Sequence, residues 1–199
     1  MNGKNIRINQ SITISSSSSR KPFKVHIRNI RKNQAQELAS LIELNRKYLA
    51  QRFSWVGRYH TVQDALAYIR KTRNASKDGL GVCCSIIRSK NNLVGVVGFN
   101  RIDYSRRSVE LAYWLSQDET GQGIATQCSM VMIEYAFTKL NLNRVISGVA
   151  TNNTKSQKVA ERLGMKAIGV IKGAEVINGK MIDHKVYCKY KKQQKALDR

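Results

Sequence analysis

The chain has 199 residues, of which 42% are hydrophobic, enough for one sizeable domain and too many for a disordered chain. No apolar run approaches the ~20 residues that span a membrane, and the serine-rich start lacks the apolar segment of a secretory signal. We therefore expect a cytoplasmic protein with no membrane partner. Residues 1–21 are expected to form a disordered tail, residues 22–190 the domain, and residues 191–199 a basic C-terminal tail.

The charge is strongly positive, with 35 Lys and Arg against 13 Asp and Glu, a formal net charge of +22. Such a field attracts RNA, anionic cofactors and acidic proteins. The basic residues are spread along the chain, so a generally basic proteome explains them equally well. The four cysteines lack a C-x-x-C spacing, which favours buried reduced thiols over a metal site or disulfides.

The predicted elements begin with a strand and two helices. Phe23 to Ile27 alternates apolar and polar residues, as a half-buried strand does. A first helix is expected from Asn33, which can cap it, to about Ala50. A second helix should run from the capping-box sequence Thr61-Val-Gln-Asp64 to about Asn74.

Beyond residue 80 strands dominate the pattern. The expected strands cover 82–88, 93–103, 109–115, 144–150, 168–171 and 181–190, and the expected helices cover 122–140 and 154–163. Hairpin turns are expected at Ser-Lys-Asn-Asn (89–92) and at Asn178-Gly179, a type I′ signal. This order predicts an α/β (mixed α+β) domain with about seven strands in a mixed sheet and about four helices on its faces.

A Gly-Gln-Gly sequence at 121–123 lies between a predicted strand and a predicted helix. Helix starts expose unpaired N–H groups and a partial positive charge, and glycines let the backbone approach an anion closely. The sequence therefore predicts a phosphate site at Gly121 to Ala125. A Walker loop is excluded because no Gly-Lys-Ser/Thr follows, and a Rossmann turn because Thr126 replaces the third glycine. An ordinary glycine turn before a helix remains the alternative.

Two further segments give this motif a family context. Gly121-Gln-Gly-Ile-Ala125, followed by Asn153-Thr-Lys-Ser156 and Glu161-Arg-Leu-Gly-Met165, resembles the GNAT family of acetyl-CoA-dependent N-acetyltransferases. The nearer likeness is to the RimJ/RimL group, which acetylates the N-termini of ribosomal proteins. The resemblance covers about residues 23–190 and implies a twisted sheet that splays open between strands 109–115 and 144–150. The family motif begins with Gln or Arg, where this chain has Thr120.

The resemblance also implies a cofactor site. Backbone groups of the splayed strand would lie along the pantetheine of acetyl-CoA, the glycine loop would hold its pyrophosphate, and the following helix would contribute side chains. The implied cofactor-binding residues are Trp114, Leu115, Gly121, Gln122, Gly123, Ile124, Ala125, Thr126, Asn153 and Ser156. No metal is implied. Asn153 is equally typical of a helix N-cap, and both roles are compatible.

The implied catalytic residues are a proton donor and a base. Ser156 matches the serine near the cofactor sulfur, and Glu175 matches the acid that activates the amine in RimL-like enzymes. Glu110 is the rival base, because a lone carboxylate in an apolar strand needs a cation or a cleft. His184 is a weaker candidate and Tyr187 is expected in the core. Phe53, Trp55 and Tyr59 either line an acceptor groove or pack in the core.

The function that the resemblance implies is acetylation of the N-terminal amine of a protein, possibly an acidic ribosomal protein. An α-amino group has a pKa of about 7.7–8.0, so its deprotonation needs only modest help. Acetylation of a small amine or an antibiotic is the second enzyme hypothesis. A non-catalytic RNA- or ribosome-binding module is the third, supported by the charge and by Thr120. Either a monomer or a homodimer is compatible with the sequence.

Overall fold

The computed structural model describes residues 5–15, 21–88 and 92–192 of the chain. Within these residues eight strands form one mixed sheet in the order β1-β2-β3-β4-β5-β6-β8-β7. The strands are β1 (Asn9–Ile14), β2 (Phe23–Asn29), β3 (Val82–Arg88), β4 (Asn92–Asp103), β5 (Ser108–Leu115), β6 (Arg144–Ala150), β7 (Lys166–Ile177) and β8 (Lys180–Tyr190). The helices are α1 (Ala35–Leu44), α2 (Arg46–Ala50), α3 (Val62–Lys77), α4 (Ile124–Thr138) and α5 (Thr154–Arg162).

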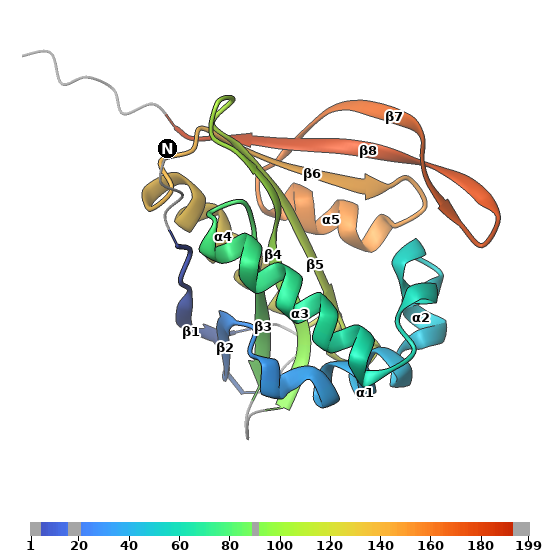
Figure 1. Ribbon diagram of the computed structural model, residues 1–199. Coiled ribbons are helices and arrows are strands. Elements are labelled where there is room, and N and C mark those ends of the chain that lie inside the picture. Colours follow the sequence, from blue (N-terminus) through green and yellow to red (C-terminus); the bar gives the residue numbers. More distant parts are fainter. Residues whose placement is uncertain (1–4, 16–20, 89–91, 193–199) are drawn as a thin grey trace, which may run out of the picture.

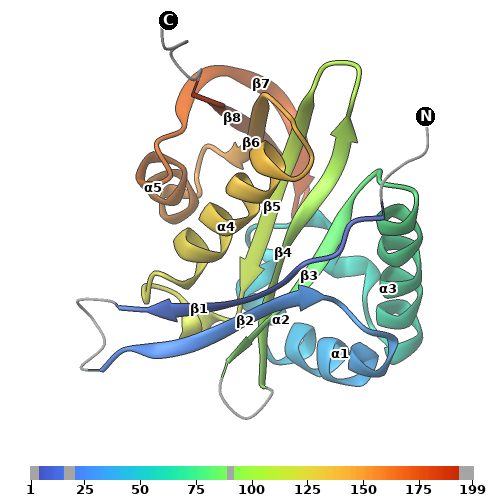
Figure 2. The same cartoon turned by 90° about the vertical axis from the view of Figure 1, so that its left-hand side faces the viewer.

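Helices cover both faces of the sheet, as Figures 1 and 2 show. Helices α4 and α5 lie over one face, and α1, α2 and α3 over the other. Two apolar clusters correspond to these layers. The larger one contains Ile124 and Met132 of α4, and the smaller one contains Leu38 of α1 and Ile69 of α3. The three-layer α/β architecture predicted from the element order is confirmed. No helix in the described part of the chain is long and apolar enough to cross a membrane.

The prediction of a disordered tail over residues 1–21 is wrong for residues 5–15. There β1 pairs antiparallel with β2, from Asn9–Arg28 to Ile14–Phe23. Ile6 and Ile14 are fully buried. The Asn29 side chain fixes the start of this segment, donating to the Ile6 carbonyl at 2.8 Å and accepting from the Ile8 N–H at 2.7 Å. The domain therefore begins before Pro22, because three buried isoleucines, Ile6, Ile8 and Ile14, anchor this segment in the core although most of β1 is exposed.

Local capping signals were more reliable than helix lengths. The predicted capping box forms, since the Asp64 N–H donates to Thr61 Oγ1 at 3.1 Å and the Thr61 N–H donates to the Asp64 carboxylate at 2.8 Å. The expected helix from Asn33 to Ala50 instead begins at Ala35 and breaks at Asn45. There the Asn45 side chain donates to the Leu41 carbonyl at 2.9 Å and ends α1.

Both predicted hairpins form. β3 and β4 pair antiparallel, although residues 89–91 of the expected turn lie outside the described residues. Asn178 and Gly179 connect β7 to β8 with φ values of 51° and 75°, the positive pair that a type I′ turn needs. The strand predicted over 168–171 is longer, spanning Lys166–Ile177 as an edge strand. β8 ends at Tyr190.

Candidate active site

The sheet opens between two parallel strands. β5 and β6 pair over three residues only, from Ser108–Arg144 to Glu110–Ile146. Beyond Glu110 the strands diverge, which leaves the remaining edges of β5 and β6 facing a gap. This is the splay that the family resemblance implied, and it offers backbone hydrogen-bonding groups to an extended ligand.

The predicted phosphate loop leads from β5 into α4. Gly121 and Gly123 adopt left-handed backbones with φ of +81° and +83°, and Gly123 is the N-cap of α4. Among the described residues, a side chain on Gly121 would meet no atom within 4 Å, so the space beside Gly121 is open. Left-handed residues at a helix start turn successive N–H groups outward as an anion-binding concavity. This arrangement fits a diphosphate.

Side chains of the loop turn back on the loop itself. Thr120 Oγ1 donates to the Gln117 carbonyl at 2.8 Å, and Gln122 Nε2 donates to the Asp118 carbonyl at 3.1 Å. Ile124 is fully buried and Thr126 is almost so. The Thr120 hydroxyl and the Gln122 amide are thus engaged within the loop itself.

Arg162 is a basic residue beside the loop that sequence reasoning did not single out. It ends α5, and its Nε lies 3.4 Å from Thr126 Oγ1 in the first turn of α4. A guanidinium at this place adds positive charge where the helix start already favours anions. The signal was present in Glu161-Arg-Leu-Gly, but only the packing of α5 on α4 brings the two segments together.

A cavity of about 540 Å³ lies along the splay. It brings together five of the predicted site residues, namely Glu110, Trp114, Asn153, Ser156 and Glu175. The loop residues Gly121–Thr126 and Leu115 are not among those lining it. The predicted site therefore divides into a phosphate loop and a separate reaction cavity, as a long cofactor with a reactive end requires.

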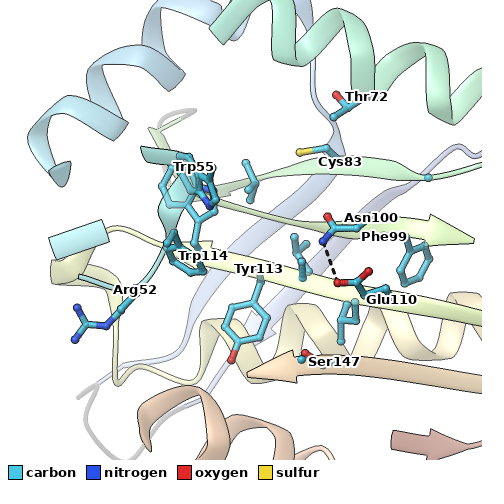
Figure 3. A pocket seen from close by; sticks show the side chains of 18 of the residues that line it. Arg52, Trp55, Thr72, Cys83, Phe99, Asn100, Glu110, Tyr113, Trp114 and Ser147 are labelled. Carbon is cyan, nitrogen blue, oxygen red and sulfur yellow. Dashed lines mark hydrogen bonds between the residues drawn. The ribbon is translucent and has the colours of Figure 1, made fainter. Parts of the chain in front are cut away.

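Glu110 lies in this cavity at the point where β5 and β6 part. Its side chain is exposed, and its Oε1 lies 3.5 Å from Asn100 Nδ2, the long contact drawn in Figure 3. Glu110 alternates with Leu111 along β5, so the carboxylate faces the cavity while Leu111 enters the core under α4. The cost of a carboxylate in an apolar strand is thus avoided by exposure to the cleft.

Glu175 enters the cavity from β7 with both oxygens engaged. Oε1 accepts a hydrogen bond from the Ser54 backbone N–H at 2.8 Å, and Oε2 lies 3.2 Å from His184 Nε2. The imidazole approach is close, but its angle does not make a hydrogen bond. The side chains of Glu175 and His184 are 20% and 21% exposed. His184 therefore belongs to the site, whereas Tyr187 is buried and donates to Gln157 Oε1 at 3.3 Å.

Asn153 and Ser156 open helix α5 at the far side of the gap. The Asn153 Oδ1 accepts from the Ser156 N–H at 3.2 Å, so Asn153 is the N-cap of α5. The cap uses the side-chain oxygen of Asn153 and not its amide nitrogen. The two predicted roles of Asn153, helix N-cap and cofactor binding, are therefore compatible. Capping also fixes Ser156 in the first turn, at the cavity wall.

Aromatic rings form the wall contributed by the segment between α2 and α3. Trp55 lies with its ring centroid 5.7 Å from Phe53, 5.5 Å from Tyr59 and 5.9 Å from Trp114. All four side chains both line the cavity and pack against the smaller core cluster. The two sequence-based interpretations, groove and core, therefore apply to the same residues.

The four cysteines are buried thiols of low reactivity. All four are buried and free. Burial raises the pKa of Cys83 to about 11 and that of Cys128 to about 12. The prediction of buried reduced thiols is confirmed. In the described part of the chain no three His, Cys, Asp or Glu side chains gather as a metal site.

Comparisons with known proteins agree with this geometry. The sequence profile described as "Acetyltransferase (GNAT) domain" matches residues 24–166. The chain belongs to the GNAT acetyltransferase family. The resemblance that the motifs carried is thereby confirmed, and solved acetyltransferases similar to this chain contain acetyl-CoA or coenzyme A.

The names of individual relatives indicate two kinds of acceptor, a ribosomal protein and a polyamine. The ribosomal-protein-serine acetyltransferase of Escherichia coli is 27% identical over 160 residues, 80% of this chain and 89% of that protein. The spermidine N(1)-acetyltransferase of Vibrio cholerae is 32% identical over 111 residues, 56% of this chain and 63% of that protein. The structure of the ribosomal L7/L12 acetyltransferase RimL with coenzyme A superposes with a TM-score of 0.80 at 22% identity, over 90% of this chain and 98% of that one.

Proposed function

We propose that this GNAT acetyltransferase transfers the acetyl group of acetyl-CoA to the N-terminal α-amino group of a protein, a ribosomal protein being the best candidate. The observation that carries the proposal is the cavity at the splay, which the Glu110 and Glu175 carboxylates line together with several aromatic rings. Carboxylates and aromatic faces attract an ammonium group, and an α-amine needs little help to lose its proton. One relative that is matched over most of its length is named as a ribosomal-protein-serine acetyltransferase.

Acetyl-CoA supplies the acetyl group as a thioester whose carbonyl carbon an amine can attack. The backbone of Gly121–Ala125 and the Arg162 guanidinium would hold the phosphates, and Asn153 the pantetheine. Glu110, whose carboxylate has a single long contact, with Asn100, among the described residues, would accept the proton of the attacking amine. Glu175 would hold the aromatic wall of the cavity in position, because its carboxylate hydrogen-bonds the backbone at Ser54 and thereby links that segment to β7. Ser156 would donate a hydrogen bond to the departing sulfur.

A small-amine acceptor is the second candidate, favoured by the same carboxylates and by the spermidine-acetylating relative. The net charge of +22 works against it, since it repels a polyamine at long range and attracts an acidic protein. Two carboxylates can reverse that field locally, so charge alone does not decide between the candidates.

The deciding experiment offers peptides with free N-termini, the same peptides with blocked N-termini but free lysines, spermidine and an aminoglycoside. Thiol release gives the rates, and fragmentation mass spectrometry locates the acetyl group. The proposal predicts acetylation of free N-termini on the α-nitrogen, with loss of activity when they are blocked. Efficient acetylation of spermidine or the aminoglycoside, without acetylation of free N-termini, would overturn it. Glu134→Gln, an exposed carboxylate on α4 outside the cavity, is the matched control for changes at Glu110.

A further inference from the structure

Tyr113 carries a polar group in the splay to which neither motif nor family resemblance assigns a task. It lies on β5, three residues beyond Glu110, the last residue paired with β6. Its ring packs against the core cluster that α4 covers, while Trp114 joins the cluster on the other face. Figure 3 shows the two side chains leaving the strand in different directions. Tyr113 and Ser156 both line the cavity.

The hydroxyl of Tyr113 is buried without a well-formed hydrogen bond. In the described residues its oxygen has no partner of acceptable geometry. Burial raises the pKa of Tyr113 to about 12, and the nearby Ser156 hydroxyl and the Arg162 charge partly oppose this rise. Ser156 is thus near enough to influence the phenol, although the contact falls short of an aligned hydrogen bond.

An unsatisfied buried hydroxyl is costly, because the group loses its water and gains nothing in return. Phenylalanine would pack the same ring without that cost. The hydroxyl is accounted for if a ligand in the splay completes its hydrogen bonding. The gap between β5 and α5, bounded by Tyr113 and Ser156, belongs to the cavity that we propose as the reaction site.

We propose that the Tyr113 hydroxyl donates a hydrogen bond to the sulfur of the bound thioester and, together with Ser156, stabilises the negative charge that sulfur acquires. The proposal rests on acetyl-CoA as the donor but not on the identity of the acceptor. The nitrogen–carbon bond forms and the carbon–sulfur bond breaks, with its electron pair staying on sulfur. Glu110 takes the proton that the amine loses. Tyr113 keeps its own proton, as expected of a phenol whose pKa is far above neutral.

The test uses coenzyme A without any acceptor, and Tyr113→Phe as the variant. The pKa of the bound thiol is followed through the ultraviolet absorbance of the thiolate. In the wild-type protein this pKa is expected to lie below that of free coenzyme A. In Tyr113→Phe it should rise by about one unit, a tenfold change in the equilibrium. The kcat with any accepted amine should fall about tenfold.

Unliganded stability separates this role from a structural one. Removing an unpaired buried hydroxyl should leave the Tm of the free protein unchanged or higher, whereas a purely structural tyrosine would lose Tm with no change in thiol pKa. Tyr104→Phe, in the turn between β4 and β5 and outside the cavity, is the matched control. It should alter neither the thiol pKa nor kcat.

A measurement on the wild-type protein keeps the proposal testable if the variant folds poorly. The affinity for coenzyme A should increase between pH 7 and pH 9 relative to that for desulfo-coenzyme A, which lacks the sulfur. An unshifted thiol pKa in the wild-type protein, or a Tyr113→Phe variant with wild-type thiol pKa and kcat, would overturn the proposal. Absence of coenzyme A binding would instead contradict the proposed function itself.

Discussion

The carboxylate of Glu175 accepts a hydrogen bond from the backbone N–H of Ser54 at 2.8 Å, although the two residues are 121 positions apart. A second contact follows the same path, since Asn178 Nδ2 donates to the Ala50 carbonyl at 3.2 Å. Together they join the end of α2 and the segment that follows it to the β7–β8 hairpin, which Figure 1 shows extending past α2. This side of the cavity is thus held together by polar contacts between segments far apart in the sequence.

Glu175→Ala should therefore weaken acceptor binding more than chemistry. Losing a hydrogen bond to a charged acceptor costs about 1.5–3 kcal/mol, so the acceptor KM is expected to rise by roughly tenfold or more, with a smaller change in kcat. Glu175→Gln keeps an oxygen for the Ser54 N–H and should have a milder effect. Steady-state kinetics with the best peptide measures both. A Glu175→Gln variant that loses nearly all kcat at an unchanged KM would make Glu175 the base instead.

Glu110→Gln should remove the proton acceptor while preserving the shape of the cavity. The loss of a general base lowers kcat by about 10²–10⁴-fold, and the affinity for acetyl-CoA should stay the same because the phosphate loop lies elsewhere. Calorimetry and initial rates with one peptide test the two statements. Glu134→Gln controls for the loss of one negative charge from this basic protein. Wild-type rates in Glu110→Gln would refute its assignment.

Cys83 and Cys128 should make stability fall at alkaline pH. Their folded pKa values of about 11 and about 12 exceed the ~8.5 of an unfolded thiol, so the folded state disfavours ionisation. The stability they contribute is complete below about pH 8.5 and is lost as the pH rises from there toward the folded values. Urea midpoints at pH 7.5 and pH 9.5 measure this loss, and Cys128→Ala should reduce it. A thiol reagent at pH 8 should label the native protein slowly and the urea-unfolded protein at once.

Ile14→Ala tests whether β1 belongs to the domain. Ile14 is fully buried, and its Cγ2 would lie 3.9 Å from a side chain placed on Gly123. Truncating a buried isoleucine costs about 2–5 kcal/mol, which chemical denaturation will detect. Because Ile14 packs beside the phosphate loop, the variant should also bind acetyl-CoA more weakly. Ser11→Ala, exposed on the same strand, is the control. Unchanged stability and unchanged acetyl-CoA affinity in Ile14→Ala would mean that β1 is not part of the folded domain.

Sequence signals correctly predicted those features of the fold that depend on neighbouring residues. The Thr61–Asp64 capping box and the Asn178-Gly179 turn formed as expected, because each depends on a few adjacent residues. The break at Asn45 was missed because the apolar stripe continues across it. β1 was missed because the neighbouring serine tract suggested a disordered tail. The three isoleucines of this segment are buried only through packing against β2 and α4.

The site followed the same division between local and long-range information. The glycine loop could be predicted from residues alone, and the splay between β5 and β6 only through family resemblance. The Glu175–Ser54 contact, the approach of Arg162 to α4 and the placement of Tyr113 near Ser156 join segments far apart in sequence. No spacing rule connects such residues, so only the fold reveals them.

Two glycines with similar left-handed backbones give the most direct test of the phosphate loop. Gly121 and Gly179 have φ of +81° and +75°, and a side chain on either would meet no atom within 4 Å. Alanine at a left-handed position costs about 1–2 kcal/mol, so Gly121→Ala and Gly179→Ala should lose similar stability.

Isothermal titration of acetyl-CoA into the wild-type protein and these two variants is the measurement that matters most. The account predicts one site per chain in the wild-type protein, near-wild-type affinity in Gly179→Ala, and at least tenfold weaker binding in Gly121→Ala. Equal affinity in both variants, or no binding of acetyl-CoA by the wild-type protein, would contradict the claim that this backbone loop holds the acyl donor.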